Sequence, residues 1–342
     1  MGGRLKLRRG VVVSAEPLEV EVGGERRRAW ADTVLLGEMR EGDEVIVNTA
    51  ALDLELGSGG FDVVHVNLTR GLEGGVGGDA NVMKLNYTSL QHPVRPAERE
   101  TADIQPKVAP VGVLPLHGHL APAAWAAAQV APGLRVGYVQ TGGGALPGSF
   151  SRDAKQLRER ELLCGHITAA PAYGGEHEAL STVGALDVAG DLGWDAILVG
   201  PGPGIIGSDT AYGHGGMAAL DSAHAALSLG LPTLLSPRLS GGDPRDRHRG
   251  LSHHTRTVLE LLLAPVDVIV PAGEPEMATS LEAFSHRVEA APADLDGYAA
   301  AGLPSVTMGR SLQDDPLFFA APLAAGHVLA ARSLARTGKD HE

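Results

Sequence analysis

Three histidines stand close together in a segment that could do chemistry. His248, His253 and His254 are three of the 14 histidines and fall within seven residues. Ser252 is a favourable N-cap, which would place His253 and His254 in the first turn of a helix. The helix dipole disfavours an imidazolium at that end, so these side chains should be neutral. A neutral imidazole is the form that a metal ligand or a general base requires.

The same segment offers charged groups that could complete a site. Asp246 supplies a carboxylate close to the histidines, and Arg238 supplies a positive charge at the end of the preceding apolar run. A polar, solvated loop with structural Asp–Arg pairs is the competing interpretation. We take four residues as candidate catalytic groups and as candidate ligands of a divalent metal: Asp246, His248, His253 and His254.

A glycine-rich loop could hold an anion. Gly142, Gly143 and Gly144 follow an apolar run, and Ser149 lies just before a helix expected to start near Ser151. Glycines let backbone N–H groups approach an anion, and the helix N-terminus adds a favourable dipole. No Gly-Lys-Ser/Thr follows, so this is not a P-loop. A tight or flexible turn is the alternative.

A second loop, residues 200–210, satisfies the pattern G-x-G-x-x-G with Gly202, Gly204 and Gly207. Pro203 removes a backbone donor, and an arginine stands where a dinucleotide fold would have an acid. We therefore do not expect NADP, although an arginine can accommodate its 2′-phosphate. A small anionic ligand that contacts Gly202, Gly204 and Arg238 is the interpretation we keep.

Two further groups follow apolar runs. His117 comes directly after the run 111–116. Glu178 lies in a segment that we expect to open a helix, after a strand near 165–169. Each is by itself more often a capping or surface group. Because carboxyl ends of parallel strands share one edge of a sheet, we assign both to the ligand site.

The elements that must carry these loops alternate from about residue 111. Apolar runs such as 135–140, 195–199 and 266–271 alternate with segments of helical periodicity. Runs that are apolar throughout indicate parallel strands buried on both faces. We predict an α/β domain over residues 108–342, with a mostly parallel sheet and helices on both faces.

The first part of the chain differs. Short β-branched runs separated by turns, as at 11–14 and 44–48, predict a small barrel-like β module over residues 1–70. Residues 71–107 combine a glycine-rich start, an expected strand at 82–89 and a proline-rich stretch, which indicates a partly flexible linker.

Composition narrows the function classes. The net charge of −13 disfavours nucleic acid as a partner, since phosphates need a basic face. Cys164 is the single cysteine, which excludes an intramolecular disulfide. We find no targeting segment and no membrane span, and expect the last apolar stretch, 316–336, to pack on the sheet as a helix. We expect a cytoplasmic protein. We also expect a homo-oligomer, because homo-oligomers are common among proteins of this kind.

Several segments resemble the bacterial family called domain of unknown function 3866: residues 199–204, 212–213 and above all 247–255. Residues 174–179 are similar to a glycine-glycine-acid element of that family, although Ser181 stands where an asparagine is usual. The resemblance spans nearly the whole chain. It implies no established activity and assigns no catalytic residue.

Our leading hypothesis is an enzyme that acts on a small phosphate- or carboxylate-bearing metabolite by metal-assisted or histidine-based hydrolysis. The alternative is a non-catalytic sensor or assembly module that binds a nucleotide-like ligand. It is favoured by the lack of a nucleophile-elbow, H-E-x-x-H or Walker sequence.

Overall fold

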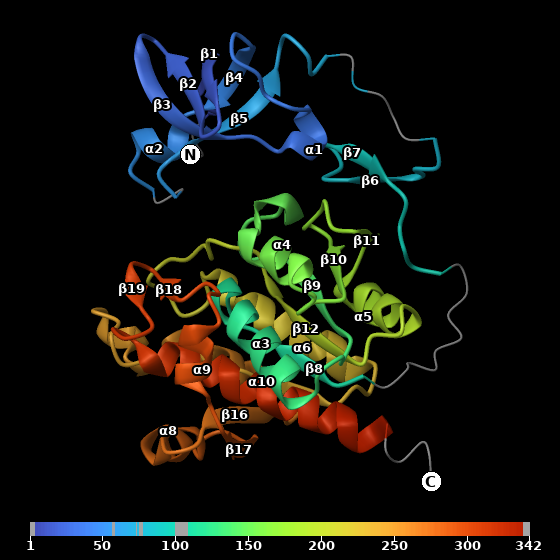
Figure 1. Ribbon diagram of the computed structural model, residues 1–342, viewed down its shortest axis with the longest axis vertical. Coiled ribbons are helices and arrows are strands. Elements are labelled where there is room, and N and C mark those ends of the chain that lie inside the picture. Colours follow the sequence, from blue (N-terminus) through green and yellow to red (C-terminus); the bar gives the residue numbers. More distant parts are fainter. Residues whose placement is uncertain (1–3, 57–58, 73, 75–77, 100–108, 338–342) are drawn as a thin grey trace. The chain divides into compact units, whose positions relative to one another are not determined.

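The computed structural model describes residues 4–56, 59–72, 74, 78–99 and 109–337. The chain divides into two compact units, Met1–Val94 and Arg95–Glu342 (Figure 1). A short hairpin, β6 (Val82–Lys84) and β7 (His92–Val94), belongs to the first unit. The rest of the expected linker is described only in part, because residues 73, 75–77 and 100–108 lie outside the described residues.

The first unit contains a closed five-stranded barrel, which confirms the predicted β module. Alternate side chains point inward, so valines such as Val20, Val45 and Val47 form its core. The strands in spatial order are β1 (Leu7–Ala15), β2 (Leu18–Val22), β3 (Glu25–Trp30), β5 (Asp62–Asn67) and β4 (Glu44–Asn48), with the short helices α1 (Thr33–Leu36) and α2 (Ala50–Asp53) between strands.

The second unit is built on an eight-stranded parallel sheet, as the apolar runs predicted. The strands in spatial order are β11 (His177–Ala179), β10 (Gly165–Ala169), β9 (Val136–Thr141), β12 (Ala196–Pro201), β8 (Val111–Val113), β13 (Thr233–Leu235), β16 (Asp267–Pro271) and β17 (Arg287–Ala291). The segment around Glu178 forms the edge strand β11, so the expected helix start there is wrong. It pairs in parallel with Ile167–Ala169, and the helix begins later, at Thr182.

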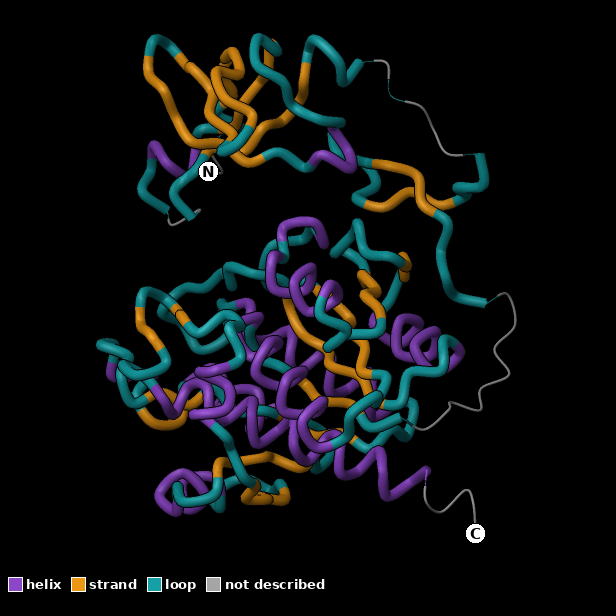
Figure 2. The backbone as a smooth tube through the Cα atoms, viewed as in Figure 1, coloured by secondary structure: helices purple, strands orange, loops and turns teal. Residues whose placement is uncertain are grey.

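Helices cover both faces of this sheet (Figure 2), because successive strand residues point to opposite sides. Tyr138 and Leu198 belong to one apolar layer, and Val139 and Val199 belong to the other. The first layer includes α3 (Leu120–Val130), α4 (Arg152–Glu159), α9 (Leu295–Ala300) and α10 (Pro316–Thr337); the second includes α5 (Thr182–Asp191), α6 (Ala218–Ser228), α7 (His253–Leu261) and α8 (Pro275–Leu281).

Helix α10 is long and apolar enough to cross a membrane by length and composition. In this structure 72% of its apolar window is buried within the protein. Phe318, Leu323 and Leu329 lie in the same apolar layer as α3. The helix therefore covers the sheet, as the sequence predicted.

The order of the strands creates two places where the chain departs in opposite directions. From β9 it runs outward to β10, whereas from the neighbouring β12 it crosses to β13. Strands β8 and β13 are a second such pair. Loops at these switch points diverge and leave room for a ligand. Two small hairpins add to this edge: β14 (Leu239–Ser240) with β15 (Gly250–Leu251), and β18 (Val306–Thr307) with β19 (Arg310–Ser311).

Candidate functional site

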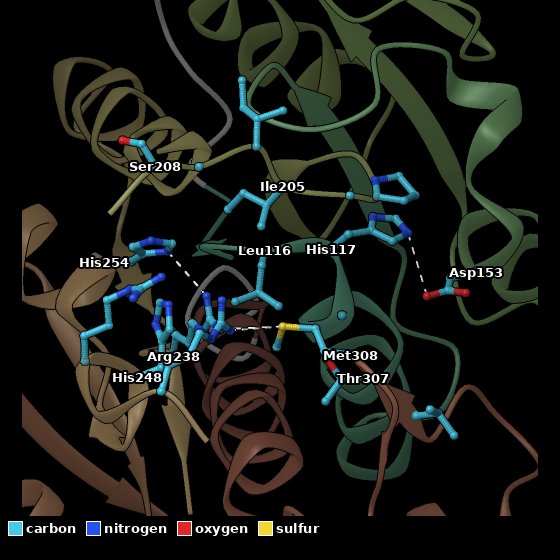
Figure 3. Close-up of a pocket in the computed structure, with 18 residues that line it drawn as sticks. Leu116, His117, Asp153, Ile205, Ser208, Arg238, His248, His254, Thr307 and Met308 are labelled. Carbon is cyan, nitrogen blue, oxygen red and sulfur yellow. Dashed lines mark hydrogen bonds and ion pairs between the residues drawn. The ribbon is translucent and has the colours of Figure 1, made fainter. Parts of the chain in front are cut away.

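A cavity of about 400 Å³ lies at the carboxyl edge of the sheet, at these switch points (Figure 3). Loops after β8, β12 and β13 supply most of its wall, and the β18–β19 hairpin supplies the rest. The lining residues are Leu116, His117 and Gly118 after β8; residues 203–208 after β12; Arg238, Arg245, Arg247, His248 and His254 after β13; Asp153 in α4; and Val306, Thr307 and Met308 in the hairpin.

The glycines of the first predicted loop serve loop packing. A Cβ on Gly144 would lie 2.1 Å from the carbonyl oxygen of Gly202, and one on Gly143 would lie 2.5 Å from that of Gly215. A Cβ on Gly202 would in turn lie 2.2 Å from the carbonyl oxygen of Ala145. The loop after β9 and the loop after β12 thus interlock through backbone contacts so close that they leave no room for a side chain at these glycines. Their interlocking holds residues 203–208 against the cavity.

Arg238 is the most enclosed charge on the cavity wall, with 2% of its surface exposed. Its Nη1 donates a long bond, 3.4 Å, to Nδ1 of His254, and its Nη2 lies 3.3 Å from Asp243 Oδ2. Its Nε is buried and has no partner in the described part of the chain. Burial lowers the pKa of Arg238 to about 10, so the side chain is still cationic near neutral pH.

The buried carboxylate of Asp243 compensates the positive charge of Arg238. Burial by itself would raise the pKa of the Asp243 carboxyl, but hydrogen bonds from Arg245 and the charges of Arg245 and Arg310 lower it overall. The carboxylate binds Arg245 Nη2 at 2.8 Å and is completely buried. Two arginines of the cavity therefore share one buried anion.

The histidines on this side of the cavity are neutral, as the sequence predicted, though burial is the main reason. Burial and the nearby Arg238 charge lower the pKa of His248 to about 3. Burial, His214 and Arg238 lower that of His254 to about 2. The predicted N-cap is confirmed, because the Ser252 hydroxyl accepts a hydrogen bond from the His254 N–H.

A second pair of groups lies across the cavity. His117 Nε2 is 2.9 Å from Ser151 Oγ and 3.7 Å from Asp153 Oδ2 (Figure 3). Burial lowers the pKa of His117 to about 4, and burial raises that of Asp153. The two environments bring the proton affinities of a base and an acid closer together, which suits them to exchange a proton.

The hydrogen-bond network assigns the tautomer of His117. The Tyr138 hydroxyl lies 2.9 Å from the Pro201 carbonyl, which can only accept, so the phenol proton points there. The phenol oxygen then accepts from His117 Nδ1 at 3.4 Å. His117 Nε2 is left with its lone pair directed at Ser151 and Asp153, which is the arrangement of a general base.

The structure brings some predicted site residues to the cavity and leaves others away from it. Those on its wall are His117, Gly204, Arg238, His248 and His254, and His253 stands beside them. Asp246 is 94% exposed and pairs with Arg249, so it does not join the histidines. Glu178 binds Thr168 and the Gly174 N–H near the sheet edge. Gly142, Gly143, Gly144, Ser149 and Gly202 are not among the residues that line it.

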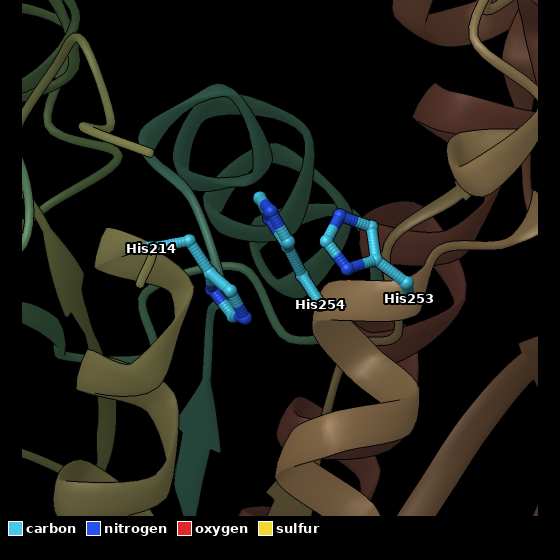
Figure 4. Close-up of side chains that lie close together, drawn as sticks. All are labelled: His214, His253 and His254. Carbon is cyan, nitrogen blue, oxygen red and sulfur yellow. The ribbon is translucent and has the colours of Figure 1, made fainter. Parts of the chain in front are cut away.

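Two residues of this region were not singled out from the sequence. Asp153 sits in the first turn of α4, where an acid is usual for capping reasons and carries no functional signal. His214 lies 3.7 Å from His254, ring centre to ring centre, in a nearly parallel stack (Figure 4). Its position at the end of the β12 loop, as His117 follows β8, is the signal that could have found it.

The parallel sheet and its cavity define a doubly wound α/β protein with a cavity at the carboxyl edge of the sheet, preceded in the chain by a small β barrel. The family model described as a protein of unknown function, DUF3866, matches residues 28–326. The chain therefore belongs to that family. The comparisons with the curated proteins and with the solved structures found no match to this chain.

Proposed function

We propose that the α/β unit is an enzyme that binds a small phosphate- or carboxylate-bearing metabolite in this cavity and hydrolyses it by histidine-based acid–base chemistry. The observation that carries the proposal is Arg238, a buried cation on the cavity wall whose Nε has no partner in the described chain. A desolvated donor without a partner is costly. An anion in the cavity would compensate this buried charge and accept a charge-assisted hydrogen bond from the Arg238 guanidinium.

The two sides of the cavity have different roles in this proposal. Arg238 and Arg245 would hold the negative group of the metabolite. His117 would accept a proton from water through Nε2 while the water oxygen attacks the ester, and Asp153 would donate a proton to the alcohol oxygen as the ester bond breaks. Leu116 lies between the two sides and would contact the carbon skeleton (Figure 3). The volume of about 400 Å³ suits a small metabolite.

Calorimetric titration with inorganic phosphate, pyrophosphate and citrate tests the binding step. We expect at least one of these anions to bind wild-type protein and Arg238→Gln to weaken it roughly 10- to 100-fold, because a charge-assisted hydrogen bond contributes about 1.5–3 kcal/mol. Arg249→Gln is the matched control, since Arg249 pairs with Asp246 and does not line the cavity. Equal weakening by both substitutions would refute a specific role for Arg238.

A screen of phosphate and carboxylate esters tests the chemical step. Once the screen has identified an ester that the protein hydrolyses, Asp153→Asn and His117→Asn should each lower kcat for that ester by roughly 10²- to 10⁴-fold, the usual contribution of a general acid or base. Substrate affinity should change far less. Tight anion binding with no turnover of any ester would instead favour the ligand-sensor function.

A further inference from the structure

We infer that His214, His253 and His254 form a three-histidine centre for a borderline transition-metal dication such as Zn²⁺. One ligand nitrogen from each lies within 4.8 Å of the others (Figure 4). His214 ends the loop after β12, and the other two open α7. The strand order, which places both loops at one edge, brings them together.

His214 already has the hydrogen-bond pattern of a metal ligand. Its Nε2 lies 2.9 Å from the Ala211 carbonyl, which can only accept, so the proton is on Nε2. The lone pair is then on Nδ1, which is buried and has no partner in the described chain. The whole residue is 6% exposed. Metal-binding histidines commonly donate their other N–H to a carbonyl in this way.

His253 supplies a second nitrogen of the same kind. Its Nε2 is buried and likewise has no partner among the described residues. The ring centre is 4.3 Å from that of His254 and 5.6 Å from that of His214. Two buried, unpartnered imidazole nitrogens in one cluster are costly in the absence of a ligand, and a metal ion satisfies both at once.

Metal capture requires a small rearrangement. Zn–N bonds of about 2.0–2.1 Å at tetrahedral angles place two ligand nitrogens about 3.4 Å apart, whereas the nitrogens of this cluster lie within 4.8 Å of one another. The rings of His214 and His254 are also stacked, at 3.7 Å and 11°. A metal lies in the plane of each ring that binds it, so one of the two rings must turn. Because the bond from His214 to the Ala211 carbonyl already suits a metal ligand, we expect the His254 ring to turn, which breaks its long bond to Arg238.

The ligand set indicates the class of metal and the kind of centre. Imidazole nitrogens favour Zn²⁺, Cu²⁺, Ni²⁺ or Fe²⁺ over Mg²⁺ and Ca²⁺. Three protein ligands leave at least one coordination position open, as in catalytic rather than structural zinc sites. His254 also lines the cavity, so that position would be close to the anion-binding wall. The metal site goes beyond the proposed function and does not depend on it.

Zn²⁺ titration of chelator-stripped full-length protein, in competition with a chromophoric chelator, tests the centre. We expect one equivalent of tightly bound Zn²⁺. Since outer-shell changes alone cost 10- to 100-fold in affinity, His214→Gln and His253→Gln should each cost at least about 100-fold. His177→Gln, on the edge strand β11, is the matched control. Far-UV circular dichroism checks that each variant is folded.

Two further readouts keep the metal site separable from the anion site. Co²⁺-loaded wild type should show the strong visible absorption of a four- or five-coordinate ion, which needs no variant. Arg238→Gln should raise Zn²⁺ affinity, because it removes a cation beside His254, while it weakens anion binding. Absence of a stoichiometric Zn²⁺ equivalent in wild type, or unchanged affinity in folded His214→Gln and His253→Gln, overturns the inference.

Discussion

Substitution of Gly144 by alanine tests how the loops that shape the cavity are held together. The added Cβ would be 2.1 Å from the Gly202 carbonyl oxygen, where ordinary contact begins at 3.4 Å, so the loops must separate by more than 1 Å. Overpacking of this kind costs about 1–3 kcal/mol. Separation also strains the 2.7 Å bond from the Ala145 N–H to the Pro203 carbonyl, which contributes about 1 kcal/mol. We expect a loss of about 2–4 kcal/mol in unfolding free energy.

Urea unfolding followed by far-UV circular dichroism measures this loss. The signal reports mainly on the second unit, which carries every described α-helix except α1 and α2. With a slope of about 2–3 kcal/mol per molar urea, the midpoint should fall by roughly 1 M. Gly241→Ala is the control, since a Cβ there meets nothing within 4 Å. A Gly144→Ala midpoint equal to that of this control would refute the interlocked-loop reasoning.

Three further predictions concern two buried polar groups and one close packing contact. Burial lowers the pKa of His166 to about 3, so the folded state resists a proton that the unfolded state accepts below its pKa of about 6.5. The stability this group contributes is present above pH 6.5 and is lost on acidification. His166→Gln should therefore reduce the loss of unfolding free energy between pH 6.5 and 5 by up to about 2 kcal/mol, and equal losses in both proteins would contradict this. The fully buried Asp315 carboxylate accepts hydrogen bonds from Ser240, Gly241, Gly242 and Arg310. Asp315→Asn should therefore lower the unfolding free energy, measured by urea titration, by about 2–3 kcal/mol. A change below about 0.5 kcal/mol would count against that network. Gly137→Ala would place a Cβ 2.0 Å from the Trp194 ring. We expect a shifted tryptophan fluorescence maximum and a lower midpoint of thermal unfolding, because the ring must move. An unchanged spectrum and midpoint would show that the ring has room to move.

The layout of the fold could be predicted because it depends on local pattern. Runs that are apolar throughout, such as residues 196–199, must be buried on both faces, and this demands a parallel sheet with helices on both sides. The N-cap at Ser252 is equally local, since its hydroxyl bonds a backbone N–H two residues away. The edge strand at Glu178 could not be predicted in this way, because its three residues have no pattern of their own and are stabilised by pairing with β10.

The candidate site, too, could be predicted from the sequence only in part. The sequence by itself determined which loops end strands and which residue types they carry, and so pointed to Arg238, His254 and the carboxyl edge of the sheet. Tertiary structure alone decided that Asp246 faces solvent and that His214 meets the histidines of α7. It also decided that the glycines interlock two loops. Sequence periodicity reports whether a residue is buried, whereas the identity of its neighbours depends on strand order, which brings together loops that are far apart in the chain.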